Sequence, residues 1–439
     1  AGLSQRGLYA QKPGRDDLQY MIQALSDPYD PETNPNGKMS MLVADNTLNK
    51  KKLVEKIHSV CSQGPPPEWV TCYGPMDGSP ELCKSVASFL ERQTVKAPVD
   101  ASCISAMSGC GSFLDAMAWC LAEPGDTCII PSPWYCAFQD DVNKRAGLKV
   151  KAAHTEHPQY ELTEAILQRA YDEAVAEGSQ VKMLLICHPC NPMGKVYSKE
   201  TLQMCMEWCA AKKIHFVSDE IYAASVFPGE SFTSVAALCH EKNPTHTEYM
   251  GNYVHILWAF SKDFSLSGFR AGILFTHNKK LKAVMGNFGV FQGISMHTQW
   301  VLSQMLDDTA WTDAYLAEVK QKLSTCYQGL KEALDAISVP LYPSQGTVMA
   351  WADFRQYLPE PTWAAERELW LDLFAKSGVL FTTGESSGSK EPGFFRLCYA
   401  VPRAKEEDPA SAMQELKTRL VSYFADKKAE PPSKRAKTG

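Results

Sequence analysis

The chain has 439 residues, of which 45% are hydrophobic and 21% are charged, and its formal net charge is -6. This length suits a large domain together with a smaller one. The lack of a basic excess argues against a nucleic-acid partner, and no apolar run approaches the roughly 18 residues of a membrane-spanning helix.

The N-terminal residues and the cysteines indicate in which cellular compartment the protein works. The first residues lack the apolar core of a secretory signal. Fifteen cysteines occur without regular spacing, many of them inside helix-like or strand-like runs, and we expect them to be reduced. We therefore expect a cytoplasmic protein.

Short β-rich runs alternate with helical patterns in the middle of the chain, which is typical of a parallel sheet covered on both faces. The expected strands are 127–130, 182–187, 214–217 and 255–258. The expected helices are 112–122, 163–177 and 201–212, the last with Ser198 as its N-cap. Ligands of such sheets bind beyond the carboxyl ends of the strands.

The pattern changes near Asp308, where a long helical segment begins and runs to Ile337. Strand-like residues 347–351 and 394–398 then flank a helix at 363–377, and a last helix is expected to start at Asp408-Pro409. This order predicts an α+β unit at the C-terminal end.

We therefore predict an α/β fold with a mostly parallel-sheet large domain at 61–305 and a smaller α+β C-terminal domain at 306–425. Residues 1–60 are expected to form an N-terminal arm and part of the small domain. The polar tail 426–439 is expected to be disordered. Its basic run Lys434-Arg435-Ala436-Lys437 is either a nuclear import signal or simply solvated charge.

Lys262 ends the apolar run that contains the fourth expected strand. A lysine amine in a partly dry pocket beside other cations can lose its proton and form a Schiff base with an aldehyde. Pyridoxal phosphate supplies such an aldehyde, together with a phosphate that Arg270, eight residues further on, could clamp. The remaining expected strands must supply the rest of the cofactor site.

Suitable side chains follow the other strands. The run Ser108-Gly109-Cys110-Gly111-Ser112 opens a helix and could bind an anion through its backbone amides. The segment Pro131-Ser132-Pro133-Trp134-Tyr135 follows the next strand and could present a ring that stacks on a flat heterocycle, although a core aromatic residue is the alternative.

Asn191 and Asp219 follow the next two strands. The Asn191 amide could donate to a phenolic oxygen, although Asn-Pro-x-Gly is also a good turn. Asp219 could keep a pyridinium nitrogen protonated, and Tyr222 could reach the phenolic oxygen of the same ring. The shared position of these residues after successive strands favours one common site.

Cys187-His188-Pro189-Cys190 has the spacing of half a metal site. A zinc site needs a second pair of ligands at matching spacing, and the sequence shows none. We predict no metal.

Five segments together resemble the class I/II aminotransferase superfamily of fold-type I pyridoxal phosphate enzymes, over about residues 30 to 425. They are residues 73–82, Asn191-Pro192-Met193-Gly194, residues 218–222, Ser261-Lys262 with residues 268–272, and Phe395-Arg396. Within the superfamily, residues 34–37, 41–46, 218–222 and 261–270 are similar to 1-aminocyclopropane-1-carboxylate (ACC) synthases.

The resemblance implies a role for each matched residue. Lys262 would be the Schiff-base lysine and the acid/base at Cα, Asp219 would pair with the ring nitrogen, and Arg396 would bind the substrate carboxylate. The remaining cofactor contacts would come from Cys110, Gly111, Ser261 and Arg270 at the phosphate, Asn191 and Tyr222 at the phenolic oxygen, Tyr135 on the ring face, and Tyr73 at the phosphate of a neighbouring subunit. A homodimer with shared active sites is implied.

Two positions depart from the family pattern. Ala259 replaces the first serine of Ser-x-Ser-Lys, which removes one hydrogen bond to the phosphate, at a cost of about 0.5 to 1.5 kcal/mol. Asp45 stands where ACC synthases have a glutamate that helps to orient S-adenosylmethionine, so this substrate-binding side chain is one methylene shorter.

The expected activity starts with removal of the Cα proton of an amino acid. We expect ACC-synthase-like chemistry, either α,γ-elimination or γ-replacement, on S-adenosylmethionine or a related amino acid. Two alternatives remain open at this stage: an aminotransferase for bulky or aromatic amino acids, and a non-catalytic binding protein.

Overall fold

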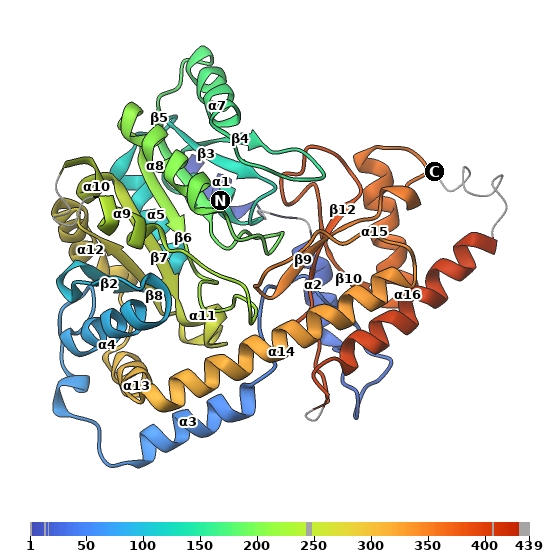
Figure 1. The fold of residues 1–439 in the computed structure, drawn as a ribbon, viewed down its shortest axis with the longest axis horizontal. Coiled ribbons are helices and arrows are strands. Elements are labelled where there is room, and N and C mark those ends of the chain that lie inside the picture. Colours follow the sequence, from blue (N-terminus) through green and yellow to red (C-terminus); the bar gives the residue numbers. More distant parts are fainter. Residues whose placement is uncertain (1, 13–14, 16, 243–247, 406–407, 430–439) are drawn as a thin grey trace.

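A seven-stranded sheet forms the centre of the larger part of the chain (Figure 1). The computed structural model describes residues 2–12, 15, 17–242, 248–405 and 408–429. Across the sheet the strands run in the order β2 (Ile104–Met107), β8 (Gly272–Thr276), β7 (Val254–Ala259), β6 (His215–Asp219), β5 (Val181–Cys187), β3 (Thr127–Ser132) and β4 (Lys149–His154).

The sheet is mostly parallel, as predicted. Strands β4, β3, β5, β6 and β7 run parallel to one another, and β8 is antiparallel to both of its neighbours, β7 and β2. The four expected strands correspond to β3, β5, β6 and β7, whereas β2, β4 and β8 were not predicted. Strand β4 lies at the edge and carries exposed or half-buried lysines, so its sequence lacks the apolar run that marks a buried strand.

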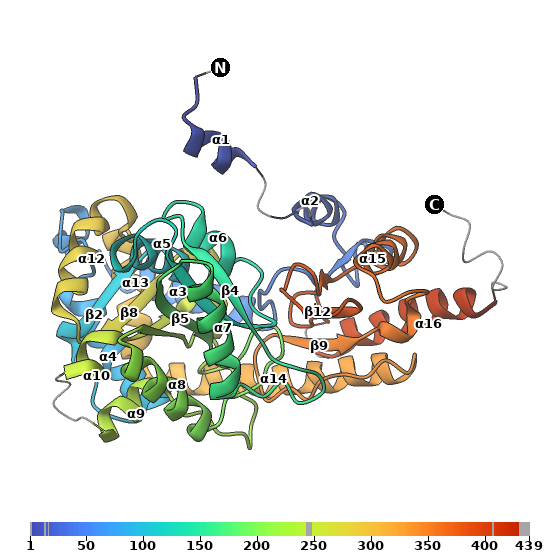
Figure 2. The same cartoon turned by 90° about the horizontal axis from the view of Figure 1, so that it is seen from above.

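Helices cover both faces of the sheet, and Figure 2 shows α5 and α12 on one side and α8 and α9 on the other. This cover explains why strand residues such as Leu184 and Leu185 have no exposed surface. The helices of this part are α3 (Lys50–Ser62), α4 (Pro80–Leu90), α5 (Cys110–Leu121), α6 (Phe138–Asn143), α7 (Glu164–Ala176), α8 (Lys199–Lys212), α9 (Val235–Lys242), α10 (Glu248–Tyr253), α11 (Phe260–Asp263), α12 (Lys279–Gln292) and α13 (Met296–Asp307).

The helix starts follow their capping residues. The predicted N-cap Ser198 accepts a hydrogen bond from the Thr201 amide at 3.1 Å. Asp308 accepts one from the Trp311 amide at 3.1 Å and begins the long α14 (Thr309–Asp335), which crosses the lower part of Figure 1. Each oxygen satisfies an N–H group that has no partner inside its helix.

The C-terminal part holds two small sheets. An antiparallel sheet has the order β11 (Thr382–Thr383), β12 (Phe394–Cys398) and β9 (Met349–Asp353). The N-terminal strand β1 (Met39–Ser40) pairs in parallel with β10 (Val379–Leu380), so the start of the chain lies beside its C-terminal half. The remaining helices are α1 (Gln5–Gln11), α2 (Leu18–Ser26), α15 (Trp363–Ser377) and α16 (Ser411–Ala429). The division at 60, 305 and 425 stays a prediction.

Three predicted boundaries were wrong. Strand β9 begins at Met349, since Thr347 has a left-handed φ of 75° that an extended strand does not allow. Helix α16 begins at Ser411, because Asp408 forms a turn in which its carboxylate accepts from the Ala410 amide at 3.0 Å. The same helix continues through Ala429, so residues 426–429 are helical, and the rest of the predicted tail, with its basic run, lies outside the described residues.

Within residues 2–242, 248–405 and 408–429, apart from 13–14 and 16, no helix combines the length and the apolar character needed to cross a bilayer.

Candidate active site

Lys262 lies on α11, directly after the buried strand β7. Its side chain is half-buried, and Nζ donates a hydrogen bond to the Ala44 carbonyl oxygen. Burial lowers the pKa of Lys262, while the nearby Asp45 carboxylate partly opposes that shift. An amine that loses its proton more readily is a better nucleophile and base.

A cradle for an anion lies between the first turn of α5 and Arg270. Gly109 caps α5 with a φ of 87°, and a Cβ atom there would lie 2.6 Å from Arg270 Nη2. A Cβ atom on Gly272 would lie 2.4 Å from the Gly109 carbonyl carbon. Only glycine at both positions lets the guanidinium approach the amides of Cys110 and Gly111, which begin the helix.

Asp219 ends β6 and lies close to both the lysine and the cradle. It pairs with Cys187 of β5 in the sheet, and its Oδ1 accepts from the Ile221 amide at 3.3 Å. Burial raises the pKa of Asp219 to about 7, against opposing effects of that amide and of Lys262. Because few donors or cations stabilise the charge of this buried carboxylate, it is well suited to pair with a cationic ring nitrogen.

Two tyrosines face the same region. Tyr222 is buried in the turn after β6, and Tyr135 is half-buried after β3. Burial raises the pKa of both phenols above the usual value, and both feel the field of Arg396. Both tyrosines therefore stay neutral at physiological pH, as hydrogen-bonding or stacking groups.

Arg396 reaches the site from β12 and is almost completely buried. Its Nη1 donates to Asn191 Oδ1 at 3.1 Å, and its Nη2 donates to the Leu42 carbonyl at 2.5 Å and to Thr382 Oγ1 at 3.0 Å. Its Nε has no partner among the described residues. A guanidinium has five N–H donors, so this buried cation retains donors for an anion.

Asp45 lies near Lys262 but is already engaged. Its Oδ1 accepts from Ser267 Oγ at 3.1 Å, and its Oδ2 is 3.7 Å from Lys50 Nζ. Ser267 also accepts, through its carbonyl, from Arg270 Nη1 at 3.1 Å. The Asp45 side chain is therefore held on the side of the phosphate cradle.

The structure brings the predicted site residues together, with one exception. Contacts or direct electrostatic interactions connect Lys262, Asp219, Cys110, Tyr222, Tyr135, Asn191, Arg270, Arg396 and Asp45, and Gly111 and Ser261 are chain neighbours of this set. Tyr73, in contrast, is 95% exposed and makes no hydrogen bond, ion pair or ring contact with that set within the described residues. Its predicted reach into a neighbouring subunit stays a prediction.

Sequence reasoning missed several groups that shape the site. The carbonyl oxygens of Leu42 and Ala44 accept from Arg396 and Lys262, and backbone acceptors leave no signal in a sequence. Thr382 comes from a strand too short to stand out. Asp141, whose pKa burial raises to about 7, lies on α6 with Oδ1 3.6 Å from where a Gly111 Cβ would be.

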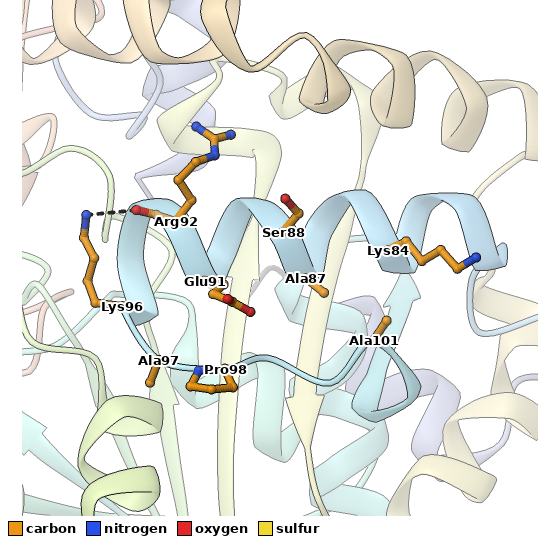
Figure 3. Close-up of a pocket in the computed structure, with 9 residues that line it drawn as sticks. All are labelled: Lys84, Ala87, Ser88, Glu91, Arg92, Lys96, Ala97, Pro98 and Ala101. Atoms are coloured by element: carbon orange, nitrogen blue, oxygen red, sulfur yellow. Dashed lines mark hydrogen bonds between the residues drawn. The ribbon is translucent and has the colours of Figure 1, made fainter.

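Other hollows and clusters do not match this chemistry. A surface groove of about 800 Å³ runs along α4 and the loop after it (Figure 3), and Lys262 is not among the residues that line it. Two of its cations are engaged within the chain, because Arg92 pairs with Asp313 and Lys96 Nζ donates to the Arg92 carbonyl at 2.9 Å.

The Cys-His-Pro-Cys segment has a packing role in the structure. His188 contacts the Thr233 carbonyl through Nε2 at 3.0 Å and the Tyr197 amide through Nδ1 at 3.3 Å, so both ring nitrogens are used. In the described part of the chain, no group of at least three His, Cys, Asp or Glu side chains is placed to hold a metal.

An amine, an anion cradle, a buried carboxylate and a buried arginine thus meet at the carboxyl ends of parallel strands. The unpartnered Nε of Arg396 and the glycine cradle both fit ligand anions, so the residues present fit pyridoxal phosphate with an amino-acid substrate. This combination defines a fold-type I pyridoxal phosphate enzyme.

Comparison with known proteins supports the same class of enzyme. The family described as aminotransferase class I and II matches residues 68–412. A 1-aminocyclopropane-1-carboxylate synthase of Glycine max is 32% identical over 386 residues, which cover 85% of this chain and 78% of the relative. 1-Aminocyclopropane-1-carboxylate synthase 9 of Arabidopsis thaliana is 31% identical over 408 residues, covering 90% and 85%.

Solved structures support the fold. An aspartate aminotransferase from Thermus thermophilus with maleate superposes with a TM-score of 0.78 at 20% identity, covering 96% of this chain and 100% of that one. An aromatic aminotransferase from Pyrococcus horikoshii gives a TM-score of 0.72 at 19% identity, covering 88% and 96%. The chain belongs to the class I and II aminotransferase family, whose members depend on pyridoxal phosphate.

Proposed function

We propose that this protein removes the Cα proton of an amino acid and then acts at the γ-carbon, as an ACC-synthase-like enzyme for S-adenosylmethionine or a related substrate. The observation that carries the proposal is the buried Arg396, whose Nε has no partner among the described residues and whose charge acts directly on Lys262. The similarity to ACC synthases over most of the chain supports the choice of reaction.

Lys262 is the base in this proposal. Bound pyridoxal phosphate supplies an aldehyde carbon and an electron-withdrawing ring, which together acidify the Cα–H bond. The lowered pKa of Lys262 leaves a larger fraction of its amine unprotonated, and the unprotonated amine can accept that proton. The Ala44 carbonyl, which accepts from Nζ, orients the amine.

Arg396 orients the substrate. Its charge and its free donors would bind the α-carboxylate, and its three bonds to Asn191, Leu42 and Thr382 fix the plane of the guanidinium. Because the group is buried, water is excluded and the ionic hydrogen bonds are stronger than at the surface.

The remaining predicted residues would hold the cofactor. Asp219 would keep the ring nitrogen protonated, and Asn191 and Tyr222 would contact the phenolic oxygen. Tyr135 would stack on the ring. The phosphate contacts would come from Cys110, Gly111, Ser261 and Arg270 and, from a second subunit, Tyr73.

With S-adenosylmethionine, the departing group needs no acid. Lys262 takes the Cα proton, a Cα–Cγ bond forms, and the Cγ–sulfur bond breaks so that the sulfonium leaves as neutral methylthioadenosine. In γ-replacement, an external nucleophile would instead bond to Cγ. The reaction therefore needs one base and a substrate whose γ-carbon is held close to its Cα.

Transamination is the second candidate, and the environment of Asp45 favours it. Its carboxylate is engaged by Ser267 and Lys50, and its side chain is one methylene shorter than the glutamate of ACC synthases. In transamination Lys262 would return the proton to the cofactor carbon, and water would release a 2-oxo acid.

We propose a homodimer in the cytoplasm as the working form. The almost fully exposed Tyr73 supports a dimer, since an aromatic side chain at 95% exposure is available to a second subunit. Buried, unpaired thiols such as Cys128 and Cys205 support a reducing compartment.

The test is product analysis. Purified, cofactor-loaded protein is mixed with S-adenosylmethionine, and the products are identified by mass spectrometry, with Lys262→Ala as the control. Methylthioadenosine formed by the wild type alone supports the proposal. Absence of methylthioadenosine, together with a 2-oxo acid from an ordinary amino acid, would select transamination.

A further inference from the structure

Asp263, the residue after the lysine, is a fully buried carboxylate to which the proposed reaction gives no role. It closes α11, so its backbone is continuous with that of Lys262. Its side chain accepts three hydrogen bonds: from the Ala224 amide at 3.0 Å, Ser225 Oγ at 2.6 Å and Trp258 Nε1 at 2.9 Å.

One of these three donors comes from the strand that precedes the lysine, and the other two come from the turn after the neighbouring strand. Trp258 belongs to β7, the strand that leads into α11. Ala224 and Ser225 belong to the turn after β6, which also holds Tyr222, and the Ser225 amide donates to the Tyr222 carbonyl at 2.9 Å. One carboxylate thus connects the lysine turn with the turn that carries the ring-binding residues.

The connection extends to the C-terminal part of the chain. The Ser225 carbonyl accepts from the Thr347 amide at 3.0 Å, and Val226 forms a β-bridge with Gly346. A Cβ atom on Gly346 would lie 2.8 Å from the Ser225 carbonyl oxygen, so the two segments are in direct contact. The position of the turn is therefore fixed from both sides.

An ionised carboxylate is the group best suited to three donors. It has only acceptor sites, whereas an asparagine would present an NH2 group to at least one N–H or O–H donor. Burial raises the pKa of Asp263 to about 6, while the three donors and the field of Lys320 on α14 oppose that rise, so the carboxylate is still mostly ionised at neutral pH. Replacing Asp263 with asparagine would leave one or two of the three buried donors without an acceptor or force the turns apart.

We infer that Asp263 is a positioning residue, which sets the place of the Lys262 amine relative to Asp219 and Tyr222. This inference rests on the proposed function, because a fixed position of the Lys262 amine matters only if that amine takes the Cα proton. A displacement of about 1 Å at a reacting group can cost on the order of a hundredfold in rate.

The test compares four variants in cofactor-loaded protein. Asp263→Asn replaces one of the two acceptor oxygens with an NH2 group. Ser225→Ala and Trp258→Phe each remove one donor and keep the carboxylate. Ser179→Ala is the matched control, since its hydroxyl contacts the Gly125 carbonyl at 2.8 Å and Thr127 Oγ1 at 2.7 Å near the start of β3, away from the site.

We expect Asp263→Asn to lower kcat about a hundredfold with little change in KM. We also expect the pH midpoint of the cofactor's visible absorption, measured without substrate, to fall by about one unit. Each single-donor variant should lower kcat about tenfold. Ser179→Ala should lower only the melting temperature.

The inference is overturned if Asp263→Asn, Ser225→Ala and Trp258→Phe lower the melting temperature but keep the kcat and absorption midpoint of Ser179→Ala. If Asp263→Asn fails to fold, the two single-donor variants decide in the same way. If the wild type forms no product from any amino acid, the proposed function fails, and the substrate-free absorption midpoint still decides the role of Asp263.

Discussion

Replacing Asp219 with asparagine should remove a defined part of the pH dependence of stability. Burial raises the pKa of Asp219 in the folded, cofactor-free chain from its ordinary value of 3.8 to about 7. The folded state therefore binds this proton more tightly than the unfolded state, so stability falls as pH rises from about 4 to about 7. Asp219→Asn has no such proton.

The size of the effect follows from the pKa difference. At pH 5 the folded state holds the proton and the unfolded state has lost most of it, whereas above pH 7 both are ionised. At 1.36 kcal/mol per pH unit, the two units between pH 5 and pH 7 cost the wild type about 3 kcal/mol. Urea unfolding of cofactor-free protein at pH 5 and pH 8 measures this difference in free energy of unfolding.

A second buried carboxylate provides the control. Glu366 also has a pKa raised by burial to about 7, and it accepts from the Gly393 amide at 2.6 Å. Glu366→Gln should change the same stability slope, but only Asp219→Asn should also weaken cofactor binding, and more at pH 8 than at pH 5. An unchanged slope in Asp219→Asn would refute the raised pKa of Asp219. Equal cofactor affinity in wild type and Asp219→Asn at pH 8 would refute the pairing of Asp219 with the ring.

Three further substitutions test the other parts of the site. Arg396→Lys loses the forked donor, and we expect kcat/KM to fall by about 10²- to 10³-fold, consistent with one or two charge-assisted hydrogen bonds, while cofactor absorption is kept. Gly109→Ala puts a Cβ atom 2.6 Å from Arg270 Nη2 at a φ of 87°, so equilibrium titration should show weaker pyridoxal phosphate binding. Asp45→Glu should raise S-adenosylmethionine turnover; an unchanged rate would remove Asp45 from the choice of reaction.

The strongly apolar strands were predictable from the sequence, and the weakly patterned ones were not. Strands β3, β5, β6 and β7 are buried along their length, so their apolar runs mark them. Strand β8 follows the lysine segment directly and turns the chain back antiparallel, which a local pattern cannot reveal. Strand β1 has two residues and exists only through its pairing with β10.

The part of the candidate site that could be predicted consists of side chains that directly follow strands of the sheet. Lys262, Asp219 and Asn191 follow that rule, so their convergence could be expected. The acceptors for Lys262 and Arg396 are backbone carbonyls from the N-terminal segment, brought in by the β1–β10 pairing. Long-range contacts of this kind depend on the tertiary fold and have no local signature.

The most direct test of the γ-carbon reaction is the ratio of two products from one substrate. Cofactor-loaded wild-type protein is incubated with S-adenosylmethionine, and methylthioadenosine and the corresponding 2-oxo acid are quantified in the same reaction by mass spectrometry. We expect methylthioadenosine to dominate and to disappear in Lys262→Ala. Accumulation of the 2-oxo acid without methylthioadenosine would contradict the proposed reaction and identify the protein as an aminotransferase.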